Sequence, residues 1–207
     1  MALSFEEVIN AKNSINIKNQ AFINGKYVNS VSGKVFEDFS PVDGKLVTSV
    51  AECDIEDINN AVKAARAVFE KGSWSRMAPN KRKKILFKLA DLMKKNILEL
   101  GILETLDMGK PISAATGDIA ACINCLNWYA EAIDKIYDDV APTRDNIIAM
   151  ITKEPLGVVG AVDADAERSL MLGAFSGAGS LSSSTVYPMP LSHWMSSVTS
   201  TMQTTSL

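Results

Sequence analysis

The sequence has few of the residue types from which many active sites are built. Its only histidine is His193, and its three cysteines are Cys53, Cys122 and Cys125. Three cysteines cannot form a disulfide framework, which argues against a small secreted domain and fits a reducing cytoplasm. A Ser-His-Asp or Cys-His mechanism would have to use His193, which lies in a Ser/Thr-rich stretch with no sign of such a site.

Strong net charge and long apolar runs are also missing. The net charge of −3 and the pI near 5.3 give no reason to expect nucleic acid or an anionic membrane as a partner. No apolar run approaches the roughly 20 residues that span a bilayer. The first residues lack the basic and then apolar order of a secretory signal. We therefore expect a cytoplasmic protein with neither a nucleic-acid nor a membrane partner.

Charged residues disappear after Arg168, and this divides the chain into two segments. Residues 1–162 carry charges of both signs, whereas residues 163–207 hold eleven serines and five threonines. Ser/Thr runs bury little apolar area, so we expect an irregular tail over 163–207.

The first segment has clear signals for strands and helices. Residues 21–53 alternate apolar residues with the turn signals Asn24-Gly25, Ser32-Gly33 and Asp43-Gly44, which predicts short hairpin strands. Apolar residues at three- and four-residue spacing predict helices over 54–72, 79–96, 97–109 and 118–137. Residues 146–162 contain two β-rich runs separated by Glu154-Pro155.

Three short motifs have a chemical and a structural interpretation. Cys122 and Cys125 form a C-x-x-C pair, but both fall in the middle of a predicted helix on its apolar side, which favours core packing over a redox or metal site. The basic run 81–84 is either an anion patch or, as we favour, a solvated helix face. The two glycines of "GVVGA" do not make a dinucleotide fingerprint. The residues by themselves indicate an α/β protein without a visible active site.

Longer strings are more specific. "FINGKYV", "KRKKILFKLADLM", "LETLDMGKPI", "WYAEAIDKIY" and "KEPLGVVGAV" occur in the order and spacing of the N-terminal third of the aldehyde dehydrogenase superfamily. The resemblance covers roughly residues 20–162. It is strongest to bacterial enzymes that act on γ-glutamylaminobutyraldehyde and related polyamine-derived aldehydes.

The resemblance implies a fold, an activity and partners. The fold is α/β, the N-terminal part of an aldehyde dehydrogenase-like subunit, with an incomplete Rossmann-like NAD-binding domain and a β-hairpin oligomerisation arm over about 141–155. The activity is oxidation of an aldehyde to a carboxylic acid with NAD or NADP, in a homo-oligomer. In such enzymes a cysteine thiolate attacks the aldehyde, an asparagine stabilises the oxyanion, and a glutamate activates water.

Few family residues transfer to this sequence. Val162 matches a strand position beside the cofactor, and Asp38 and Asp107 match loop positions that help to bind a structural monovalent cation. No catalytic residue transfers, because "DADAERSL" follows Val162 where the family has its oxyanion asparagine. We expect a truncated or rearranged family member that is inactive alone. The alternative interpretation of residues 163–207 is a genuine C-terminus that docks on the core. The alternative function is a non-catalytic fragment that pairs with full-length subunits.

Overall fold

The computed structural model describes residues 4–160, so Val162 and the tail 163–207 lie outside the described residues. In chain order the elements are α1 (Phe5–Ser14), β1 (Ala21–Ile23), β2 (Lys26–Val28), β3 (Val35–Phe39), β4 (Leu46–Ala51), α2 (Ile55–Lys71), α3 (Pro79–Lys95), α4 (Ile97–Met108), α5 (Ile112–Ala132), β5 (Asp139–Ala141) and β6 (Ala149–Ile151).

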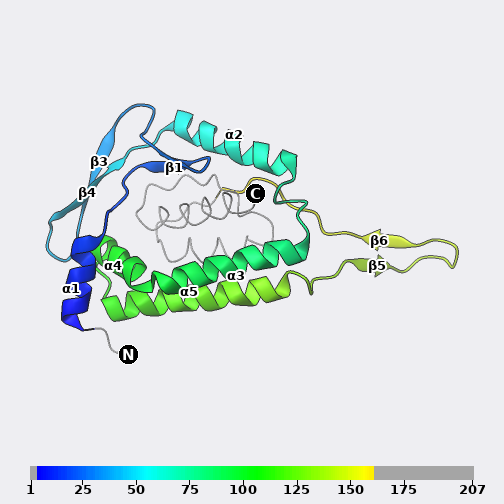
Figure 1. The fold of residues 1–207 in the computed structure, drawn as a ribbon. Coiled ribbons are helices and arrows are strands. Elements are labelled where there is room, and N and C mark those ends of the chain that lie inside the picture. Colours follow the sequence, from blue (N-terminus) through cyan, green and yellow to red (C-terminus); the bar gives the residue numbers. More distant parts are fainter. Residues whose placement is uncertain (1–3, 161–207) are drawn as a thin grey trace.

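The core lies where α3 and α4 pack against α5. Helices α3 and α5 run side by side over most of their length (Figure 1). The shared cluster consists of Leu86, Leu89, Ala90, Met93, Leu100, Ile119, Cys122, Ile123, Leu126 and Ala130. A Cβ on Gly101 of α4 would come within 2.7 Å of the Thr116 methyl group of α5. The glycine that weakens α4 as a helix therefore allows it to pack closely on α5.

The ends of α2 agree with the sequence signals. The Asp54 side chain accepts a hydrogen bond from the N–H of Glu56, and Asp57 completes a capping box. The helix ends at Gly72, which has a φ of 75°. The predicted apolar side is only partly covered, because Ile55 is 78% exposed while Ala61 and Ala65 are buried. The buried residues of α2 are Asp57, Ala61 and Ala65, whereas Ile55, Ile58 and Val62 are exposed.

The strands form three separate antiparallel hairpins, β1–β2, β3–β4 and β5–β6. The predicted turns are present, with positive φ at Asn24, Gly25, Gly33 and Gly44. Mixed helices and strands agree with the predicted α/β class. Within residues 4–160 every sheet is a hairpin, so the Rossmann-like domain stays a prediction.

The third hairpin projects away from the helices (Figure 1). It lies within and beside the predicted arm at 141–155. The first β-rich run is therefore confirmed as β6, whereas residues 156–160 of the second form no strand. A buried parallel strand needs neighbouring strands for its backbone hydrogen bonds, and the described residues provide none beside this run.

Among the described residues, no helix combines the length and apolar character needed to cross a membrane.

Candidate functional site

The structure brings together the two residues predicted to bind a cation. Asp38 lies on β3, where the pairing with β4 is irregular between Asp38 and Phe39. Asp107 lies in the last turn of α4. The negative charge of Asp38 acts on the carboxyl group of Asp107. Two carboxylates far apart in sequence are therefore electrostatic neighbours.

The environment of this pair disfavours two negative charges. Burial, followed by repulsion from Asp38, raises the pKa of Asp107 to about 6. Burial also raises the pKa of Asp38. The Oδ2 atom of Asp38 is buried without a hydrogen-bond partner. A cation at this position would neutralise the repulsion, and the carbonyl end of α4 adds a favourable partial negative charge.

The backbone around the pair is tightly packed. In the β3–β4 turn the N–H of Ser40 donates to the carbonyl of Lys45 at 2.9 Å, and the N–H of Gly44 donates to the carbonyl of Ser40 at 2.8 Å. Gly109, with a φ of 71°, ends α4 against this turn. A Cβ on Gly109 would lie 2.9 Å from Cγ of Pro41. Glycine at this position therefore permits the close contact between the turn and α4.

The donor set bears on which cation fits. Within the described residues no three His, Cys, Asp or Glu side chains are grouped as a metal site. Carboxylate oxygens suit hard cations rather than zinc. The pair is therefore compatible with the predicted monovalent cation.

The cysteines do not form a reactive site. Cys122 is buried in the core on α5, and Cys125 packs against the same cluster. Burial raises the pKa of Cys122 to about 11, so its thiol stays protonated at neutral pH. Burial, with the charges of Asp57 and Asp54, also raises the pKa of Cys53. The prediction of core packing for the C-x-x-C pair is confirmed.

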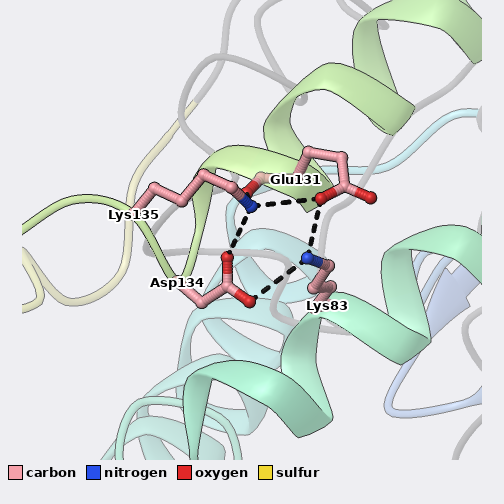
Figure 2. A network of polar contacts seen from close by, with 4 residues as sticks. All are labelled: Lys83, Glu131, Asp134 and Lys135. Atoms are coloured by element: carbon pink, nitrogen blue, oxygen red, sulfur yellow. Dashed lines mark hydrogen bonds and ion pairs between the residues drawn. The ribbon is translucent and has the colours of Figure 1, made fainter.

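A network of charges that sequence patterns did not reveal lies where α5 leads into the hairpin. Lys83 of α3 contacts Glu131 at 2.7 Å and Asp134 at 3.2 Å, and Lys135 contacts both carboxylates (Figure 2). Lys83 is only 20% exposed. The expectation of a solvated face over 81–84 was therefore wrong for Lys83. Its partners lie 48 and 51 residues away, beyond the reach of helix periodicity.

The base of the hairpin is also held by hydrogen bonds. The N–H of Lys153 donates to Oδ1 of Asp138 at 3.0 Å, and the Lys153 ammonium group donates to the carbonyl of Tyr137 at 2.5 Å. The ammonium group also lies 3.7 Å from Asp139. These contacts close the hairpin directly after the charged network at the end of α5.

Comparison with known proteins gives the family. A family model described as the aldehyde dehydrogenase family matches residues 27–164. The chain belongs to the aldehyde dehydrogenase family. An aminoacetaldehyde dehydrogenase of Pseudomonas aeruginosa is 42% identical over 161 residues, which is 77% of this chain and 32% of that protein. The resemblance read from the sequence strings is confirmed.

Solved structures of this family share the fold. An indole-3-acetaldehyde dehydrogenase of P. syringae, in complex with NAD+, superposes with a TM-score of 0.73 at 44% identity, over 75% of this chain and 32% of that one. A γ-glutamyl-γ-aminobutyraldehyde dehydrogenase of Burkholderia cenocepacia gives a TM-score of 0.72 at 39% identity, with the same coverage of 75% and 32%. The chain spans about a third of the length of the relatives it matches.

Proposed function

We propose that this chain supplies the N-terminal scaffold of a cytoplasmic aldehyde dehydrogenase subunit, which oxidises an aldehyde to a carboxylic acid with NAD or NADP. The match to the family model over residues 27–164 carries this proposal. The relatives are named for aminoacetaldehyde and for γ-glutamyl-γ-aminobutyraldehyde, so we propose an amino-substituted aldehyde of this kind as the substrate.

The described residues supply structure rather than reacting groups. When bound, a nicotinamide would accept the hydride that leaves the aldehyde carbon. The residue assigned to it, Val162, lies outside the described residues. The helical core, in which Cys122 is a protonated packing residue, provides no described nucleophile. Residues 4–160 therefore serve to build and support the subunit.

The first test measures activity. The purified 207-residue chain, incubated with aminoacetaldehyde and either NAD or NADP, is expected to produce no NADH or NADPH above background. The reason is that its sequence lacks the asparagine, glutamate and cysteine motifs that follow Val162 in the family. The aminoacetaldehyde dehydrogenase of P. aeruginosa serves as the positive control. Turnover that persists in chain prepared from a host without its own aldehyde dehydrogenases would show this to be wrong.

The second part of the proposal concerns assembly. Apolar side chains of the β5–β6 hairpin are largely exposed, including Val140 at 71%, Ile148 at 82% and Met150 at 69%. A two-stranded hairpin cannot bury these residues against itself. We propose that the hairpin pairs with another subunit, either a copy of this chain or a full-length aldehyde dehydrogenase. The latter is the non-catalytic alternative for the function of the chain.

The assembly test uses a matched pair of variants. The variant Ile148→Asp is expected to abolish co-purification with a co-expressed full-length relative, because it places charge in the proposed interface. The control is Ile55→Asp, which changes an equally exposed apolar residue on α2. Equal loss with both variants would indicate nonspecific adhesion, and retention with the hairpin variant would refute the role of the arm.

We further propose that Asp38 and Asp107 hold a monovalent cation that fixes the β3–β4 turn against α4. The raised pKa of Asp107 and the buried Oδ2 atom of Asp38 support this proposal. If this is so, the stability of the chain should depend on pH and on added potassium.

A further inference from the structure

An apolar pocket lies between α1, the β3–β4 turn and α4. Its volume is about 580 Å³, within the range of pockets that hold small molecules. Phe5, Val8 and Ile9 of α1 line it together with Ile102 and Leu106 of α4. Helix α1 has no buried residue. The helix therefore lies over the pocket without filling it.

The two hydroxyl groups in the lining of the pocket already form hydrogen bonds within the protein. The hydroxyl group of Thr105 donates to the carbonyl of Gly101 at 2.9 Å, and that of Ser40 accepts from the N–H of Val42 at 3.4 Å. Around the opening, Phe5 is 82% exposed and Val42 is 70% exposed. Exposed apolar side chains gathered around a pocket are typical of a binding site. The interior therefore suits a hydrocarbon or aromatic body.

The charges at the rim define the rest of the ligand. Three charged residues line the pocket: Lys12, Asp43 and Lys45. The ammonium group of Lys45 lies 2.9 Å from Oδ2 of Asp43, and this pair has no net charge. Hydrogen bonds to Lys45, followed by the charges of Lys45 and Lys12, lower the pKa of Asp43, so Lys12 belongs to the same group of charges. The two lysines and the one aspartate together leave one positive charge at the mouth of the pocket. A single negative head group on an apolar body complements that arrangement.

We propose that this pocket binds an amphipathic monocarboxylate, with its apolar body between α1 and α4 and its carboxylate beside Lys12. One net positive charge at the rim matches a monoanion better than a polyphosphate, which would require several donors. The inference does not depend on aldehyde oxidation, because binding is its readout.

The test is calorimetric titration of the full 207-residue chain with decanoate below its micelle-forming concentration. We expect saturable binding of one decanoate per chain. The variant Lys12→Glu should weaken that binding about fivefold, because the rim charge is solvent-exposed. Lys34→Glu, which changes the net charge equally at a residue outside the pocket, should leave it unchanged.

Two further measurements separate the head group from the apolar body. Decanol should bind more weakly than decanoate to the unmodified chain, and Lys12→Glu should not weaken it further. Ile9→Asp should weaken both probes, and because no residue of α1 is fully buried, circular dichroism should show the core intact. Non-saturable binding, equal weakening by both lysine variants, or equal affinity for decanol and decanoate would overturn the proposal. So would a dimer of the chain that forms through this pocket and excludes decanoate.

Discussion

The helical core buries its apolar side chains within the chain, whereas the β5–β6 hairpin leaves its apolar side chains exposed. In the core, Leu89, Met93 and Leu100 are each 1% exposed, and they lie within a shared cluster on three helices. In the hairpin, β5 and β6 contain no buried residue. The core stabilises itself, whereas the hairpin keeps its shape through contacts at its base. This difference indicates that the core provides stability, and it supports the proposal that the hairpin pairs with another subunit.

The largest expected effect comes from opening a cavity in the core. Leu89→Ala should reduce the free energy of unfolding by about 3 kcal/mol, because a fully buried side chain is removed from a packed cluster. The matched change Ile148→Ala in the hairpin should leave that free energy almost unchanged. Urea denaturation followed by circular dichroism measures both. A comparable loss with Ile148→Ala would contradict the division between core and hairpin.

A smaller loss is expected at the junction of the first hairpins with α2. Asp57 is 1% exposed, and its carboxylate accepts hydrogen bonds from the N–H of Val31 at 3.0 Å and of Asp54 at 3.1 Å. Asp57→Ala leaves both donors without this partner and should cost about 2 kcal/mol of unfolding free energy. Glu56→Ala, at the neighbouring exposed position, is the control. Equal values for the two variants would mean that the bonds of Asp57 contribute little.

The carboxylate pair should show itself in the dependence of stability on pH. The pKa of Asp107 is about 6 in the folded chain, above the ordinary aspartate value of 3.8 that applies in the unfolded chain. The folded chain therefore binds more protons than the unfolded chain between these values, and this contribution makes stability fall as pH rises through that window. Asp107→Asn should remove this part of the dependence. The measurement is urea denaturation at several pH values with and without KCl.

Addition of potassium to the same experiment tests whether a cation binds to the two carboxylates. Above about pH 6 both carboxylates are charged, so KCl should stabilise the chain more there than near pH 4. The benefit should disappear in Asp107→Asn. Choline chloride at equal ionic strength controls for general screening, and equal stabilisation by both salts would refute a specific cation site.

The smallest effect is expected in the charged network between α3 and α5. Lys83→Met should lower Tm by roughly 1–2 °C, because the carboxylate partners are solvent-exposed and retain Lys135. Lys84→Met changes an exposed neighbour on the same helix and should have no effect. Differential scanning calorimetry distinguishes the two, and identical values would leave the network without a measurable role in stability.

Local patterns predicted most of the first segment. Asp54, Gly72 and Gly109 mark helix ends correctly because capping depends on neighbouring residues alone. The helix predicted over 118–137 instead spans Ile112–Ala132, with Pro111 at its N-cap.

Contacts between distant segments were harder to predict. The pairing of Asp38 with Asp107 came only from the family resemblance. The contact of Lys83 with Glu131, and the pocket beneath α1, depend on how helices pack, which residue spacing does not encode.

The contacts of Lys153 join the two strands at the base of the hairpin. The hairpin begins shortly after α5 ends, and just before it Lys83 and Lys135 form ion pairs with Glu131 and Asp134. Because Lys83 belongs to α3, these ion pairs connect the base of the hairpin to the contact between α3 and α5. Capture of the hairpin by another subunit would thus stiffen the last turn of α5, and amide hydrogen exchange would slow there.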